Sequence, residues 1–174
     1  MRQVRLAVVF VSLLTLAACV PVPAHAPAPT DAATEQPLFA TDAEALAAAE
    51  EVYREYLRVA DEVDTPSDIE RLAPLTSESW LASERDTRLN LEANGIHTEG
   101  ASALRWMQLQ RREAGLISAY ACIGFGSTRV VDANGADVTP VDRGSEIQLL
   151  VTLIEVRETL VVDRSELWSN TCSS

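Results

Sequence analysis

The spacing of apolar positions changes from helical to strand-like near residue 103. In the first half, apolar residues recur at three- and four-residue steps with charged residues between them: Leu46, Ala49, Tyr53, Tyr56, Leu57, Ala60 and Val63. This spacing is typical of an amphipathic helix with one buried face. The preceding Thr41-Asp42-Ala43-Glu44 fits a capping box. The pattern therefore predicts a long first helix that begins near residue 41.

Two shorter helices are predicted after it. Thr65-Pro66 places proline at the first helical position, and Pro74 limits the length of this helix. Thr76-Ser77-Glu78-Ser79 offers the start of a third helix, and Asn94-Gly95 fits its left-handed C-terminal cap. The first half of the folded part is thus expected to be helical.

From Ala103 onward the apolar period is two, as in strands with alternating faces. The strands are expected at about residues 104–109, 117–125, 129–131, 136–138, 147–156 and 159–168. Asp132-Ala133-Asn134-Gly135 is interpreted as a hairpin loop between the third and fourth of them. Helices followed by a meander of antiparallel strands predict an α+β fold, with four to five strands in its sheet.

One strand is apolar on both faces. The run Leu149-Leu150-Val151-Thr152-Leu153-Ile154 leaves no polar face for solvent, so we expect it to be covered twice. The first helix can cover one face. The other can line a cavity, meet a second copy in a homodimer through the sheet, or be buried by the chain's own loops.

The N-terminus has the parts of a secretory signal. Arg2 and Arg5 precede the apolar run Leu6–Leu16, which is too short to span a bilayer. Leu16-Ala17-Ala18-Cys19 follows and resembles the lipobox of bacterial lipoproteins. The resemblance implies a diacylglycerol thioether on Cys19, cleavage just before it, and a protein anchored to the extracytoplasmic face of the cell membrane. The alternative is an ordinary signal peptide that is cleaved elsewhere.

These features predict three segments. Residues 1–18 are the signal peptide. Residues 19–37 carry the lipidated cysteine and a tether rich in proline and alanine, which favours an extended polyproline II spacer. Residues 38–174 form a single globular domain of a size that supports its own core.

Composition excludes several function classes. Asp and Glu number 26 against 14 basic residues, for a formal net charge of −12, which makes nucleic acid an unsuitable partner. All the basic residues are arginine. The absence of lysine from the sequence excludes Schiff-base chemistry and a Walker-type phosphate loop.

Beyond Cys19 the sequence has Cys122 and Cys172. Outside the cytoplasm an even count favours a disulfide between them. The alternative is a cysteine nucleophile, for which the only histidines are His25 in the tether and His97 in a predicted loop. Asp132–Asp137 is interpreted as a turn, because its glycine falls in the fourth position and a calcium loop needs it in the sixth. We expect no metal and no cofactor.

The order of elements over residues 40–172 resembles the nuclear-transport-factor-like, or ketosteroid-isomerase-like, cone fold. The resemblance implies a curved sheet that wraps the first helix around a cavity. Enzymes of this fold place an Asp or His, often with Tyr, inside the cone, and the strands here supply Tyr120 and Asp163. The candidate pocket residues are Tyr53, Tyr56, Trp106, Tyr120 and Asp163.

The chain is also similar to small lipoproteins of actinobacterial envelopes in residues 41–46, 136–140 and 165–169. The favoured hypothesis is a non-catalytic binding or accessory module of the envelope, which holds a small apolar ligand or an envelope protein. One alternative is a structural component of a transport or secretion assembly. The other is a cone-fold enzyme of the isomerase or cyclase kind that uses Asp163 or Tyr120.

Overall fold

The computed structural model describes residues 38–173, which lie within one compact unit, Glu35–Ser174. The predicted lipidation site at Cys19, the predicted signal peptide and the predicted tether lie outside the described residues. The helices are α1 (Asp42–Asp61), the 3-10 helix η1 (Pro66–Leu72) and α2 (Glu78–Ala93). The strands are β1 (Ile96–Glu99), β2 (Ala103–Glu113), β3 (Leu116–Gly124), β4 (Arg129–Asp132), β5 (Glu146–Val156) and β6 (Thr159–Ser169).

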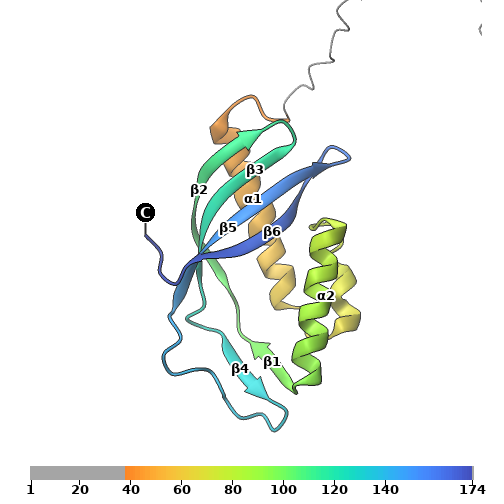
Figure 1. Ribbon diagram of the computed structural model, residues 1–174, viewed down its shortest axis with the longest axis vertical. Helices are drawn as coiled ribbons and strands as arrows, with labels where there is room; N and C mark the ends of the chain where they lie inside the picture. The colour runs from red at the N-terminus through yellow and green to blue at the C-terminus, as the bar shows by residue number, and fades with distance from the viewer. Residues whose placement is uncertain (1–37, 174) are drawn as a thin grey trace, which may run out of the picture. The chain divides into compact units, whose positions relative to one another are not determined.

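The fold is α+β, as predicted, and the sheet curves over α1 (Figure 1). Strands β2-β3-β5-β6 form one antiparallel sheet in that order. Figure 1 shows α2 beside α1 at the open side of the sheet, with β1 and β4 at one end. Hydrogen bonds join the C-terminal half of α1 to α2, from Tyr56 to Glu84 and from Arg88 to the Ala60 carbonyl.

Helix α1 begins where the sequence predicts. The Thr41 side chain accepts from the backbone N–H of Glu44, and the Glu44 carboxylate accepts from the backbone N–H of Thr41. This reciprocal pair satisfies two backbone donors that a helix N-terminus otherwise leaves without partners. The buried face of the helix consists of Ala45, Ala49, Tyr53, Tyr56 and Val59.

The small sheet was not predicted. Strand β4 pairs with β1 in antiparallel register, with Ile96 opposite Asp132 and Glu99 opposite Arg129. The prediction that residues 129–131 pair mainly with residues 136–138 is wrong. These two segments share one isolated bridge, from Val131 to Asp137. Local turn signals identified the turn at Asp132, but pairing with a strand some thirty residues earlier has no local signal.

The doubly apolar strand β5 is buried on its inner face and partly covered on its outer face. Val151 and Leu153 are fully buried and belong to the core that α1 shares with the sheet. Leu150 and Ile154 point to the opposite, outer face, where they are half-buried. Leu150 pairs with Tyr120 there. The chain's own side chains thus give the outer face partial cover, and a homodimer through the sheet stays a prediction.

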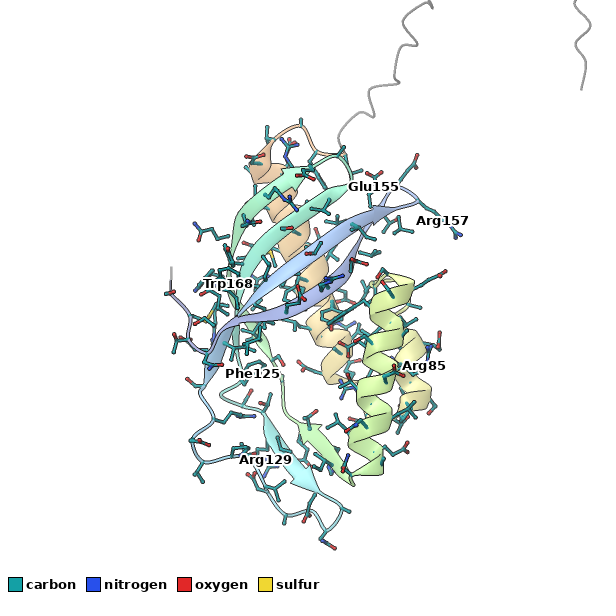
Figure 2. All side chains as sticks on the ribbon, viewed as in Figure 1. Arg85, Phe125, Arg129, Glu155, Arg157 and Trp168 are labelled. Carbon is teal, nitrogen blue, oxygen red and sulfur yellow. A yellow bond between two sulfur atoms is a disulfide. The ribbon has the colours of Figure 1, made fainter. Side chains whose placement is uncertain are left out.

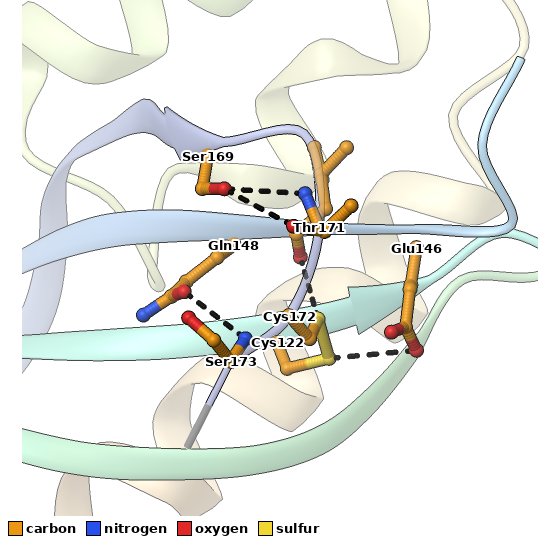
Figure 3. The surroundings of a disulfide bond; sticks show 8 residues. Cys122, Glu146, Gln148, Ser169, Thr171, Cys172 and Ser173 are labelled. Atoms are coloured by element: carbon orange, nitrogen blue, oxygen red, sulfur yellow. Dashed lines mark hydrogen bonds between the residues drawn. A yellow bond between two sulfur atoms is a disulfide. The ribbon is translucent and has the colours of Figure 1, made fainter.

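Cys122 and Cys172 form the predicted disulfide, with Cα atoms 5.6 Å apart across a separation of 50 residues (Figure 3). The bond ties the C-terminal tail to the outer face of β3. Beside it, the backbone N–H of Ser173 donates to Oε1 of Gln148, at 3.5 Å. The Glu146 carboxylate lies next to the two sulfurs, within 4.8 Å. Because the sulfurs are bonded to each other, this group is not a metal site.

Candidate functional site

An open cleft of about 760 Å³ lies between the C-terminal half of α1, helix α2 and the junction of the two sheets. Its size falls in the range of small-molecule sites. Helix α1 supplies Tyr56, Leu57, Ala60 and Asp61, and helix α2 supplies Glu84, Thr87, Arg88 and Leu91. The far wall includes Phe125 and Ile147, and Figure 2 shows Phe125 where the chain leaves the large sheet for β4. The cleft therefore has an apolar wall and several polar side chains.

Tyr56 is the predicted pocket residue that lines this cleft. Its hydroxyl donates to the Glu84 carboxylate at 2.7 Å and accepts from Nε1–H of Trp80 at 3.1 Å. Burial and the neighbouring Glu84 charge both raise the pKa of Tyr56, because each disfavours the phenolate. The phenol therefore acts as a fixed donor that orients Glu84 at the edge of the cleft.

The other four predicted pocket residues do not line the cleft. Tyr53 is fully buried beside Tyr56, and its hydroxyl lies 2.9 Å from Ser165 Oγ. Trp106 pairs with Cys122 on the outer face of the sheet. Tyr120 packs against Trp168 with ring centroids 5.1 Å apart, near the C-terminal end of β6 (Figure 2).

Asp163 is displaced by an irregularity in β6. The register between β5 and β6 shifts at this point, so that Arg164 pairs with Thr152 and Val162 with Leu153. Asp163 has no partner in this ladder, and its carboxylate accepts from Ser79 Oγ at 3.3 Å. The carboxylate is therefore directed to the start of α2 rather than into the cleft, contrary to the expectation for a cone-fold catalytic acid.

Arg88, like Glu84, is a side chain of this site that sequence reasoning missed. Its Nη2–H donates to the Ala60 carbonyl at 3.1 Å, while its Nε is buried without a hydrogen-bond partner. Arg88 borders both the main cleft and a neighbouring hollow of about 310 Å³. In the sequence, Glu84 and Arg88 look like an i, i+4 surface pair, so no local signal separates them from the solvated charges of α2.

Most other charged groups of the cleft are already paired. Both carboxylate oxygens of Asp61 accept from Ser102, one from the backbone N–H and one from the hydroxyl. The Arg143 guanidinium donates to the carbonyls of Phe125 and Thr128 and to the Thr128 hydroxyl. These bonds fix the walls of the cleft, because each joins segments that are distant in sequence.

The two buried tyrosines predict an alkaline loss of stability. Burial raises the pKa of Tyr53 from 10.0 to about 12, and the pKa of Tyr56 rises further. Above pH 10.0 the unfolded chain releases protons that the folded chain keeps, so the free energy of unfolding falls as the pH rises. Denaturant titration across this range should show that decline. The variant Tyr56→Phe should show a shallower decline, and an identical one would contradict the assignment.

No helix among residues 38–173 combines the length and apolar character needed to cross a membrane.

The Asp132–Asp137 segment is a turn, as interpreted, in which Asp132 accepts from the backbone N–H groups of Asn134 and Ala136. These bonds lower the pKa of the Asp132 carboxyl. The oxygen atoms of Asp132 are thus engaged by the turn itself.

By sequence, no protein family and no curated protein matches the chain. Solved structures do match in fold. One is the intermembrane-space region of the chloroplast protein ARC6, at 11% identity and a TM-score of 0.50, covering 71% of this chain and 96% of that one. Another is a candidate aromatic ring hydroxylase from Novosphingobium aromaticivorans, at 17% identity and a TM-score of 0.52, covering 72% and 88%. At these identities they show the fold alone, and that fold is the cone predicted from the order of elements.

Proposed function

We propose that this protein is a non-catalytic binding module of the cell envelope, and that the cleft between α1 and α2 holds a small, largely apolar ligand. The observation that carries the proposal is the cleft itself, about 760 Å³ with Leu57, Phe125 and Ile147 in its wall. Pockets of this size with few placed polar groups are typical ligand sites. Asp163 and Tyr120 both lie away from the cleft, which weakens the enzyme alternative that used them.

The place of action is part of the same proposal. Lipidation at Cys19 would anchor the chain to the extracytoplasmic face of the membrane, and residues 19–37 would act as its spacer. Two acyl chains suffice for stable anchoring where one is marginal. Labelling of cells with a fatty-acid analogue should mark the wild-type chain and leave Cys19→Ala unlabelled. Equal labelling of both would overturn this assignment.

The binding proposal is tested with the neutral apolar dye N-phenyl-1-naphthylamine, whose fluorescence rises in an apolar site. The protein is the chain from residue 19 onward with Cys19→Ser, which is purified without lipid or detergent. We expect saturable binding with one dye per chain. Absence of saturable binding would overturn the proposal.

A pair of variants locates the dye. Thr87 is an exposed residue of α2 that lines the cleft, so Thr87→Trp should fill the cleft and abolish binding. Ala82 is exposed on the same helix and does not line the cleft, so Ala82→Trp adds the same ring elsewhere and should leave binding intact. If both variants lose dye binding equally, or if neither loses it, the dye binds outside the cleft.

If the cleft binds no ligand, the alternative function is that of a structural component in a transport or secretion assembly. The outer face of the sheet, with Tyr120 and Trp168, would then be the surface to examine. Chemical crosslinking on intact cells distinguishes the two cases, because an assembly component gives a crosslink that Trp168→Ser removes.

A further inference from the structure

The Arg88 guanidinium is the cation of the cleft with unused hydrogen-bond donors. A guanidinium carries five N–H donors, and the hydrogen bond found for Arg88 uses one of them, from Nη2 to the Ala60 carbonyl. Within residues 38–173, no carboxylate lies within ion-pair distance of it, while Arg143 is held by three acceptors. Its Nε also lacks a partner but is covered by protein atoms, so the donors left for a ligand are the remaining N–H groups at the end of the partly buried side chain.

The other groups of the cleft limit which acceptor can approach. Glu84 accepts from Tyr56, and Asp61 accepts twice from Ser102, so neither needs a cation from the ligand. With Asp142, these carboxylates make the cleft repel a molecule that carries several negative charges. A single negative charge on an apolar body can pair with Arg88 while its body contacts the apolar wall.

We infer that the cleft binds an apolar monocarboxylate, whose carboxylate is held by Arg88 and whose hydrocarbon part lies against Leu57, Leu91 and Phe125. Carboxylate and guanidinium match in geometry, since two parallel N–H groups of arginine reach two carboxylate oxygens. The inference rests on the proposed function, because it specifies the charge of a ligand for the same cleft. Arg88 acts as a binding residue that selects the acid over its neutral analogues.

The test is displacement of bound N-phenyl-1-naphthylamine by octanoate and by methyl octanoate, on the same chain with Cys19→Ser. The two competitors share one hydrocarbon chain and differ in charge. We expect octanoate to displace half of the dye at about a tenfold lower concentration than the ester, as for one charge-assisted hydrogen-bonded pair. Equal concentrations for both competitors would overturn the inference.

Variants separate charge from shape. Arg88→Leu should remove the preference for octanoate and keep dye binding, and Arg88→Lys should keep part of the preference because it retains the charge without the fork. The matched control is Arg85→Leu, which removes an arginine of α2 that pairs with Glu70 outside the cleft (Figure 2). The control should behave as wild type. Preservation of the preference in Arg88→Leu would overturn the assignment to this residue.

The outcomes distinguish the two proposals. If the starting protein fails to bind the dye, the ligand-binding function fails and the inference fails with it. If it binds the dye but does not discriminate octanoate from the ester, only the inference fails. Thermal melting of each variant shows whether it is folded, and Arg88→Gln, which keeps the size of the side chain, replaces Arg88→Leu if the latter is unfolded.

Discussion

Replacing both Cys122 and Cys172 by serine is expected to lower the free energy of unfolding by about 3 to 4 kcal/mol, in the chain-entropy view of disulfides. The bond closes a loop of 50 residues, so its loss frees the unfolded chain to explore many more conformations. For a domain of this size the change corresponds to a melting temperature lower by about 10 °C. The folded state keeps its sheet, because β3 is held by β2 and β5 on both sides.

Thermal melting followed by circular dichroism measures this effect. The starting protein is again the chain from residue 19 onward with Cys19→Ser, and the double variant adds Cys122→Ser and Cys172→Ser to it. Reduction with dithiothreitol should lower the melting temperature of the starting protein and leave the double variant unchanged. A double variant that melts at the same temperature as its parent would contradict a stabilising disulfide.

The disulfide also bears on the cleft. Asn170 lines the cleft and lies two residues before Cys172 in the tail that the bond ties to β3. Freeing that tail should loosen this part of the rim more than the walls formed by α1 and α2. The double variant is therefore expected to bind the dye more weakly at temperatures where it is still folded.

Local patterns predicted the elements whose signals lie within a few residues. The capping box of Thr41 and Glu44 and the apolar stripe of α1 depend on contacts within one helix, and the structure has both. The disulfide followed from the count of cysteines and the predicted compartment. The pairing of β1 with β4 failed for the opposite reason, because Ile96–Glu99 has no alternation that identifies it as a strand before its partner is known.

The site was harder to predict because it depends on which face each strand residue takes. Register irregularities between Leu104 and Trp106 in β2 and between Val162 and Arg164 in β6 change the faces of the residues beside them. Trp106 and Asp163 adjoin these irregularities, and both were assigned to the cavity. Tyr56 lines the cleft and Tyr53 does not, although helical spacing places both on the inner face of α1, so whether either binds a ligand stays a prediction.

Two charged side chains of the cleft, Glu84 and Arg88, come from α2, a helix whose sequence pattern indicates solvent exposure. Helix α2 has no buried residue, and its charges read as an exposed face. Glu84 and Arg88 become cleft residues only because α2 lies across the open side of the cone, next to α1 (Figure 1). This packing is a tertiary property, so a helical pattern by itself does not distinguish a cleft wall from a solvent face.

Strand β5 gives the second large effect, through the difference between its two faces. Leu153 is fully buried in the core under α1, so Leu153→Ala is expected to lower the free energy of unfolding by about 3 kcal/mol. Leu150 is half-buried on the outer face beside Tyr120, so Leu150→Ala removes the same atoms at a cost of about 1 kcal/mol. Urea denaturation of the two variants measures the difference directly.

The same pair of variants addresses what covers the outer face. If the monomer's own side chains are its only cover, the cost of Leu150→Ala should not depend on protein concentration. If a second copy binds there, Leu150→Ala should shift the protein toward monomers in analytical ultracentrifugation, and its cost should rise with concentration, since association stabilises the folded state. Equal costs for Leu150→Ala and Leu153→Ala in a monomer would contradict the division of β5 into an inner and an outer face, because a surface leucine with partial cover cannot leave a cavity as large as a core leucine does.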